Sequence, residues 1–251
     1  MEHQKLYDYI LTLGDNSLIL GHRLSELCGH GPSLETDIAL TNISLDLYGQ
    51  VRNYFQYAAE LAGDGATEDS VALLRIERAY RNTWIVEQPN EDFAHVICRQ
   101  FLFDSFHMPL MQQLCESKDE RISAIAKKSI KEASYHERFS SEWMKRLGGG
   151  TEVSNQKMQA ALNHLYPFVN EFFQETDLDK EMKDNGIGAD LVVLKNQYFQ
   201  NVNRLLEEAE LIIPEPVWRQ TDGKLGFHSE HLGFILAELQ YMQRAYPDSE
   251  W

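Results

Sequence analysis

An unbroken amphipathic pattern from residue 120 to residue 147 limits the fold more than any other part of this 251-residue sequence. Its apolar and small residues recur at alternating spacings of three and four, which places them on one face of an α-helix. That face consists of Ile122, Ile125, Ser129, Ala133, His136, Ser140, Trp143 and Leu147. At ~1.5 Å of rise per residue such a helix is about 40 Å long. Partner helices of similar length are therefore needed to bury the apolar face of this helix.

The same periodicity predicts helices along nearly the whole chain. They cover residues 4–29, 34–62, 67–87, 91–116, 120–147, 154–175, 189–211 and 229–245. Ser33 is expected to cap the second helix, and Gly148-Gly149-Gly150 ends the fifth. No segment of useful length shows β-alternation. We predict an all-α antiparallel bundle of long helices with additional C-terminal helices. One domain over residues 1–251 is expected, because the later helices carry apolar stripes that the bundle must cover.

Composition and termini narrow the class of protein. With 23 Lys and Arg against 39 Asp and Glu, the net charge of -16 opposes binding to nucleic acid. Cys28, Cys98 and Cys115 lie far apart, which argues against a disulfide framework and a thiolate zinc site. Neither a signal-type start nor an apolar run of membrane-spanning length is present. We expect a cytoplasmic protein with no membrane partner.

Polar side chains lie in the apolar stripe of the predicted helix 91–116. Asp104 and His107 are spaced i,i+3, which is the spacing of a di-iron helix with Asp in place of Glu. Asp92 and His95 show the same spacing in the same helix, so the pattern has low specificity. The alternative is that Asp104 forms a buried pair with His136 or a nearby base.

The predicted helix 120–147 has half of such a motif. His136 lies on the inward stripe, but the residue three positions before it is Ala133, which has no oxygen for a metal. Glu132 lies about 100° around the helix from Ala133, and it could chelate an ion together with His136. Alternatively, His136 is a buried, hydrogen-bonded histidine and Glu132 an ion-pair residue at the edge.

The first two predicted helices supply few ligands. Asp46 and Gln50 belong to a polar row on the second helix, where an interhelical hydrogen-bond network is the alternative to a metal site. On the first helix, nothing except Asp15 or Glu26 supplies a good ligand. A four-carboxylate, two-histidine centre needs about six inward ligands from four helices. The candidates are too few for two irons, while a single metal stays open.

Extended runs of the sequence resemble a known family. They are Leu13-Gly14-Asp15-Asn16, Leu45-Asp46-Leu47-Tyr48-Gly49-Gln50, Val86-Glu87-Gln88-Pro89-Asn90, Lys131-Glu132-Ala133-Ser134-Tyr135-His136 and Gly226-Phe227-His228-Ser229-Glu230-His231-Leu232-Gly233. From about residue 13 to the last residue the chain resembles the C subunit of the multicomponent phenylacetyl-CoA epoxidase, the PaaC family. The resemblance implies a ferritin-like fold and a role in aerobic phenylacetate breakdown. It also implies that the di-iron site belongs to a related A subunit, for which the C subunit is the structural partner.

Set against the pattern of the A subunit, this chain keeps some ligand positions and has lost others. Asp104 and His136 fall where that pattern has ligands. Ala133 and Leu18 fall where it has glutamates, and segment 46–50 departs from its Glu-x-x-His. The resemblance therefore implies a degenerate centre, with no catalytic residue, no metal and no cofactor in this chain.

Three functions follow as hypotheses. The leading one is a non-catalytic scaffold that binds the catalytic A subunit together with other subunits of the complex. The second is a metal-dependent oxygenase with a reduced or single-metal centre, which would use Asp104, His107, Glu132 and His136. Ferritin-like iron storage is third, because few carboxylates point inward. Self-association as a homodimer stays open.

Aromatic residues near the C-terminus are candidate interface anchors, with a core or capping role as the alternative. They are Trp218, Phe227, Tyr241, Tyr246 and Trp251. His228, Glu230 and His231 suggest a metal cluster, but without a second arm they are better interpreted as the first turn of the last helix, where Glu230 suits the helix dipole.

Overall fold

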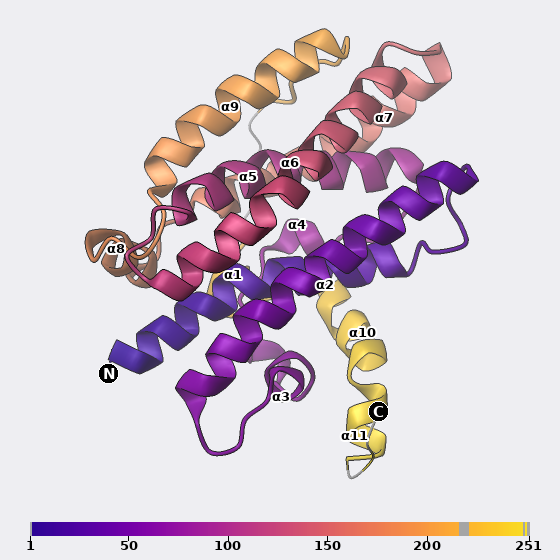
Figure 1. Cartoon of the computed structure of the whole chain (residues 1–251). Helices are drawn as coiled ribbons and strands as arrows, with labels where there is room; N and C mark the ends of the chain where they lie inside the picture. The colour runs from indigo at the N-terminus through magenta and orange to yellow at the C-terminus, as the bar shows by residue number, and fades with distance from the viewer. Residues whose placement is uncertain (1, 216–220, 248, 250–251) are drawn as a thin grey trace. The chain divides into compact units, whose positions relative to one another are not determined.

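The computed structural model describes residues 2–215, 221–247 and 249, and these residues form an all-α fold (Figure 1). Among these residues, an isolated antiparallel β-bridge joins Asp222 to Phe227 and belongs to no strand. The all-α class is confirmed, and the long paired helices fit a ferritin-like bundle. In the described part of the chain, no helix is both long and apolar enough to cross a bilayer.

The chain divides into two compact units. The first contains Met1–Pro89 and Thr221–Trp251, and the second contains Asn90–Gln220. Each is described by itself below. The expectation of one domain over residues 1–251 stays a prediction.

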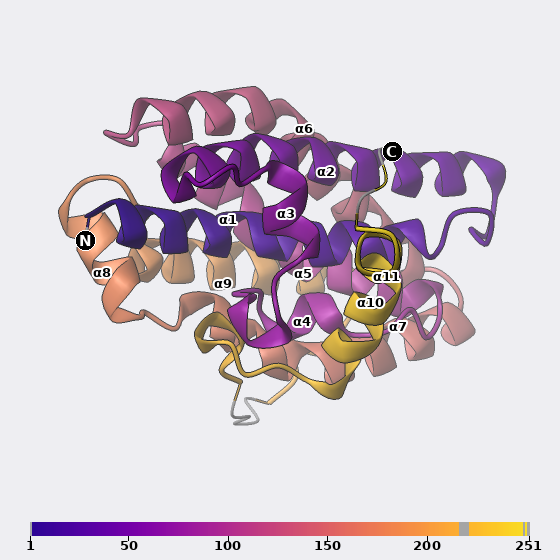
Figure 2. The same cartoon turned by 90° about the horizontal axis from the view of Figure 1, so that it is seen from below.

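The first unit is built on two long helices, α1 (Glu2–Ser25) and α2 (Leu34–Ala62), which run side by side (Figure 2). Ser33 is the N-cap of α2, as predicted, and its side chain accepts a hydrogen bond from the Thr36 amide. The apolar residues of α2 that recur every three or four positions are buried: Leu40, Ile43, Leu47, Val51, Tyr54 and Ala58. Burial of such apolar faces is the main source of helix stability in a folded chain.

The prediction of one helix over residues 67–87 is wrong. The segment forms α3 (Glu68–Leu73), a 3₁₀ turn η1 (Glu77–Ala79) and α4 (Trp84–Glu87). Two amides of this segment donate to side chains of α1. The Arg81 amide donates to Asp15 Oδ2 at 2.8 Å, and the Thr83 amide donates to Asn16 Oδ1 at 2.8 Å. Tertiary hydrogen bonds thus replace the i→i−4 bonds of a continuous helix.

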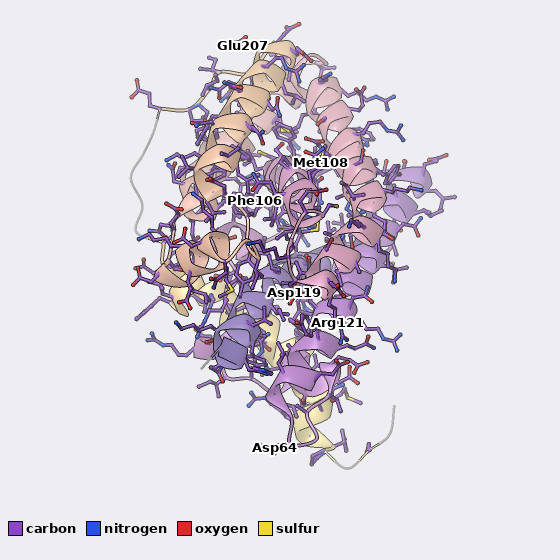
Figure 3. The ribbon with its side chains drawn as sticks, turned by 60° about the vertical axis from the view of Figure 1, so that its left-hand side comes forward. Asp64, Phe106, Met108, Asp119, Arg121 and Glu207 are labelled. Carbon is purple, nitrogen blue, oxygen red and sulfur yellow. The ribbon has the colours of Figure 1, made fainter. Side chains whose placement is uncertain are left out.

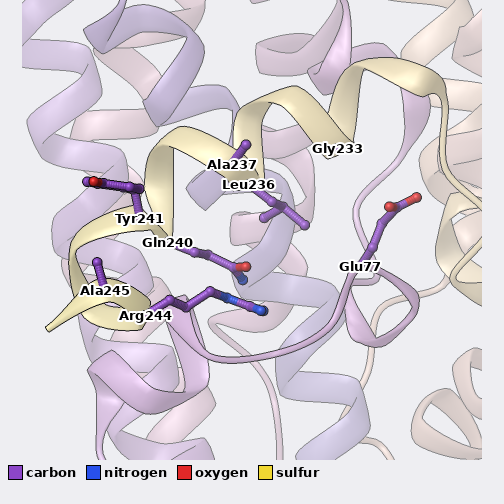
Figure 4. Close-up of a pocket in the computed structure, with 8 residues that line it drawn as sticks. All are labelled: Glu77, Gly233, Leu236, Ala237, Gln240, Tyr241, Arg244 and Ala245. Atoms are coloured by element: carbon purple, nitrogen blue, oxygen red, sulfur yellow. The ribbon is translucent and has the colours of Figure 1, made fainter. Parts of the chain in front are cut away.

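The C-terminal segment begins with a 3₁₀ turn η3 (Gly223–Leu225), followed by α10 (Glu230–Leu239) and α11 (Tyr241–Ala245). The predicted single helix is interrupted at Gln240, whose Nε2 donates to Arg75 O at 2.8 Å and to Tyr80 Oη at 2.9 Å. Figure 4 shows Gln240 and Arg244 projecting toward the segment that carries Glu77, where they line a groove of about 510 Å³.

The second unit is built on α5 (Phe93–Leu114) and α6 (Glu120–Gly148). Both helices have aspartate N-caps. Asp92 accepts from the His95 amide, and Asp119 accepts from the amides of Arg121 and Ile122. Gly148 is needed at the end of α6, because a Cβ there would clash with the carbonyl oxygen of Ala209.

The predicted inward face of α6 is confirmed through Ser140 and then shifts. Trp143 and Leu147 are half-buried, while Met144 and Gly148 take the inward positions. Because the helix repeats every 3.6 residues, the next inward residue after Ser140 is Met144, four positions later, and not Trp143, three positions later.

The rest of the second unit contains α7 (Glu152–Leu165), a 3₁₀ segment η2 (Tyr166–Phe173), α8 (Asp177–Asp184) and α9 (Leu191–Glu208). The prediction of one helix over residues 154–175 is wrong in its second half. The α-helix ends at Leu165 because Pro167 lacks an amide hydrogen and its ring clashes with the preceding turn. The short helix α8 was not predicted.

Candidate functional site

A buried carboxylate lies at the centre of the second unit. Asp104, on α5, is 1% exposed, and both of its oxygens accept hydrogen bonds. Gln100 Nε2 donates to Oδ1 at 2.7 Å, from one helical turn earlier. Ser140 Oγ, on α6, donates to Oδ2 at 2.8 Å. Because Gln100 and Ser140 are also fully buried, the carboxylate is held by two neutral donors away from water.

Burial dominates the acidity of this carboxyl group. Desolvation raises the pKa of Asp104 to about 7, although the charge of His136 and the hydrogen bonds from Ser140 and Gln100 act to lower it. The Glu137 carboxylate acts in the raising direction, and burial also raises the pKa of Glu137 itself. A carboxyl group that titrates near neutrality is suited either to proton transfer or to a neutral structural role.

The two predicted histidines lie in the same interior. His136 is 0% exposed and His107 is 3% exposed. Burial lowers the pKa of His107 to about 3, with a further lowering from the charge of His136. The His107 Nδ1 atom is buried without a hydrogen-bond partner among the described residues, and its ring packs 4.9 Å from that of Phe103. His107 is therefore neutral in the folded chain.

The charge of His136 lowers the pKa of Asp104, so the two side chains interact electrostatically, while their direct pairing stays a prediction. Ala133 is 2% exposed, so the residue without a metal ligand does face the interior. Glu132, next to it, is only half-buried.

Asp46 and Gln50 belong to the first unit, on α2. Asp46 is half-buried, whereas Gln50 is 1% exposed. Both polar atoms of the Gln50 amide are buried without a hydrogen-bond partner among the described residues. The expected hydrogen-bond network is thus not formed by the Gln50 side chain.

A groove of about 600 Å³ opens beside the buried cluster, lined by residues of α5, α6 and α9. Met108, on α5, lines it, and Figure 3 shows that residue between α9, which carries Glu207, and α6, which begins near Asp119 and Arg121. The lining contains three cations, Arg138, Lys145 and Arg204, against the carboxylates of Glu137 and Glu208, and Glu208 lies 3.0 Å from both Lys145 and Arg204. The groove therefore offers little net charge to an anionic ligand.

These residues do not fit a two-iron centre within this unit. Ala133 has no oxygen at the inward position, and both oxygens of Asp104 are already engaged by Gln100 and Ser140. Ligand atoms that lie within 4.8 Å of one another occur elsewhere in the described residues, in a Glu91, His95, His164 group and in a His22, Glu26, Glu238 group. Asp104, His107 and His136 belong to neither group.

The first unit contains two buried charge networks that were not predicted from the sequence. Asp15 is 0% exposed and forms an ion pair with Arg75, which also lies 4.1 Å over the ring of Tyr80. Glu87 is 0% exposed as well, and its carboxylate accepts from Asn82 Nδ2 at 2.8 Å. Asp15 was a candidate metal ligand in the sequence, but its carboxylate binds Arg75 instead.

Glu87 also binds the segment that begins α10. His228 Nδ1 lies 2.7 Å from Glu87 Oε1, and the Ser229 amide donates to Glu87 Oε2 at 2.9 Å. Ser229 is the N-cap of α10 and Glu230 lies in its first turn, as predicted. Three runs that carried the family resemblance, at residues 13–16, 86–90 and 226–233, thus supply buried contacts of the first unit. Their acidic residues inside apolar contexts were the signal for these networks.

Comparison with known proteins fixes the family. The family model described as phenylacetic acid catabolic protein matches residues 1–251. The chain belongs to this family. Among its relatives is the C subunit of the 1,2-phenylacetyl-CoA epoxidase of Escherichia coli (strain K12). The identity is 49% over 247 residues, which are 98% of this chain and 99% of the relative. The resemblance to epoxidase C subunits seen in the sequence is confirmed.

Proposed function

We propose that this chain is a non-catalytic structural subunit of a phenylacetyl-CoA epoxidase complex in the cytoplasm. It would bind a related catalytic A subunit that holds the di-iron centre, together with the other subunits of the complex. The named relative is the C subunit of such an enzyme, and the similarity spans nearly all of both chains.

The observation that carries this proposal is the chemistry of the α5–α6 interior. Ala133 faces inward where a ligand carboxylate is needed, and Asp104 is held by Gln100 and Ser140. A dry site with one carboxyl group that titrates near neutrality supplies too little negative charge for two iron ions. The interior therefore suits packing and hydrogen bonding.

Exposed aromatic side chains of the first unit are the proposed contacts with partner subunits. Phe227 is 53% exposed, Tyr241 61% and Tyr246 52%, so these three side chains are not core residues. Large aromatic side chains are enriched in interface hot spots. Trp218 and Trp251, the other two candidate anchors, lie outside the described residues.

A second candidate is a metal-dependent oxygenase with a single-metal centre. The observation that favours it is His107, whose buried Nδ1 has no hydrogen-bond partner among the described residues. A neutral imidazole of this kind is a suitable metal ligand. It ranks second because burial of the His107 ring against Phe103 explains its neutral state without a metal.

The deciding experiment is co-expression with an A subunit, followed by size-exclusion chromatography and phenylacetyl-CoA-dependent oxygen uptake. If the chain is a scaffold, it forms a stable complex with the A subunit. The variants Asp104→Asn and His107→Gln then leave turnover per assembled complex unchanged. An oxygenase loses turnover in both variants while assembly stays intact. Two equivalents of iron in the chain purified alone would rule out the scaffold role.

A further inference from the structure

Three metal-binding side chains converge where α5 begins and α7 ends, away from the degenerate centre. Glu91 precedes the N-cap of α5, His95 lies in its first turn, and His164 lies in the last turn of α7. His95 Nε2 is 3.2 Å from Glu91 Oε2, and His164 Nδ1 is 3.9 Å from Glu91 Oε1. The two imidazole centroids are 5.5 Å apart. All three residues belong to the second unit.

A second carboxylate orients one of these histidines. Asp92 Oδ1 lies 2.8 Å from His95 Nδ1 and also accepts from the His95 amide at 3.0 Å. An aspartate can only accept when ionised, so the network assigns the ring proton to Nδ1. The Nε2 atom faces Glu91 Oε2 at 3.2 Å, and an ion that binds there takes the Nε2 lone pair in place of a proton. A carboxylate behind a metal-binding histidine is the usual way in which proteins fix the ring.

We propose that Glu91, His95 Nε2 and His164 Nδ1 bind one divalent transition-metal ion, with Zn²⁺ as the first choice. Two imidazoles and a carboxylate match the preference of zinc rather than that of magnesium or calcium. Ligand atoms about 2.0–2.1 Å from a tetrahedral ion are roughly 3.3 Å apart. The 3.2 Å separation from Glu91 Oε2 agrees with this, while the 3.9 Å separation is measured to Glu91 Oε1. All three ligand atoms lie within 4.8 Å of one another, so side-chain movements that bring them closer complete the site.

Solvent access fits an ion with an open fourth position. The His95 side chain is 12% exposed, whereas that of Glu91 is 49% exposed and that of His164 is 32% exposed. The ion can therefore enter from the surface, and a water molecule can complete the tetrahedron. When bound, it ties the start of α5 to the end of α7.

The second group of converging ligand atoms is a weaker site and serves as the comparison. In the His22, Glu26, Glu238 group, Arg23 Nη1 lies 3.0 Å from both oxygens of Glu26. An arginine bound to the central carboxylate competes with a cation and repels it. The structure thus favours the Glu91, His95, His164 group.

The test uses the untagged full chain, freed of metal by a chelator and titrated with Zn²⁺ by calorimetry and with Co²⁺ by visible absorption. We expect one ion per chain and the intense absorption of tetrahedral Co²⁺. His95→Gln and His164→Gln should each weaken binding at least ~100-fold, and Asp92→Asn about 10–100-fold. Asparagine is as good an N-cap as aspartate, so Asp92→Asn leaves α5 capped. Saturating zinc should raise the melting temperature by roughly 5 °C.

His22→Gln is the matched control, because it removes a histidine from the other group, and it should leave the affinity unchanged. Glu91→Gln alters a half-exposed side chain and measures the carboxylate contribution without a risk to folding, which circular dichroism checks for every variant. The proposal is overturned if His164→Gln and Glu91→Gln both keep wild-type affinity. Loss of binding in His22→Gln alone would place the ion in the other group and overturn it as well.

Discussion

Glu87 and His228 meet inside the first unit, with 2.7 Å between Oε1 and Nδ1 and no exposed surface on either side chain. They are far apart in the sequence, and each lies in a run that carries the family resemblance. The backbone carbonyl of Glu87 also accepts from Arg23 Nη2 at 2.7 Å. One residue thus connects α1, α4 and the start of α10.

Removal of either partner should destabilise the chain strongly. Glu87→Ala or His228→Ala leaves a buried polar group without its partner, which costs about 3–5 kcal/mol. Urea unfolding of both single variants and of the double variant measures the coupling, which should be at least ~1 kcal/mol. Glu230→Gln is the control, since that exposed side chain only favours the helix dipole, and its loss costs less than about 1 kcal/mol. Equal effects of Glu87→Ala and Glu230→Gln would contradict this prediction.

The buried Asp104 should make stability depend on pH. Its pKa of about 7 in the folded chain lies above the ~3.9 of an unfolded chain. The folded state therefore binds more protons between pH 4 and 7, so ionisation destabilises it as the pH rises. We expect the free energy of unfolding of Asp104→Asn, relative to that of the wild type, to rise by about 1.4 kcal/mol per pH unit between pH 4.5 and 6.5.

His107 has the opposite effect on stability. Its pKa of about 3 in the folded chain lies below the ~6.5 of an unfolded chain, so its contribution rises with pH across the same range. The effect is present in wild type and in Asp104→Asn alike and cancels in their difference. Urea unfolding of both proteins at pH 4.5, 5.5 and 6.5 checks the prediction, with the exposed Asp64→Asn as control. A difference that stays flat with pH would contradict it.

Two glycines of the C-terminal segment should respond in opposite ways to alanine. Gly226 has a φ of +84°, and a Cβ there would clash with the carbonyl oxygen of Arg78. Gly226→Ala should lower stability by at least ~1–2 kcal/mol. Gly233 lies within α10, and the nearest atom to its Cβ would be 3.9 Å away. Gly233→Ala should raise stability by about 0.5–1 kcal/mol. Melting temperatures that shift in the same direction would disprove this pair of predictions.

The ion pair between Asp15 and Arg75 should be needed for the fold of segment 67–87. Asp15→Ala removes the acceptor for Arg75 and for the Arg81 amide, and it leaves a buried guanidinium without its carboxylate. We expect a loss of about 3–5 kcal/mol and early proteolysis within this segment. Asp69→Ala, at an exposed position of α3, is the control and should have little effect on either measurement. Protease resistance that equals the wild type would contradict the prediction.

The long helices could be predicted because their signals are local. The 3.6-residue spacing of Leu40, Ile43 and Leu47 fixes the inward face of α2, and Ser33 supplies its cap. The inward position of Ala133 followed from the same periodicity. Local patterns of this kind also established the all-α class and, together with the resemblance, the family.

The errors occur where distant residues compete for backbone groups. Asp15 and Asn16 bind the amides of Arg81 and Thr83, and Gln240 donates to Arg75 O, so two predicted helices are interrupted. The periodicity of each helix could not show that Gln100 and Ser140 both donate to Asp104, because Gln100 lies on α5 and Ser140 lies on α6.

The sequence by itself determined the helical class, the family, the inward faces of the long helices and the inward position of Ala133. Only the tertiary structure decided that Asp104 is held by neutral donors, that Glu87 receives His228, and that His164 approaches Glu91 and His95. The physical reason is the distance along the chain over which each kind of interaction acts. Helix periodicity and capping act within about one turn of the chain, whereas a buried charge takes its partner from whichever helix packs against it.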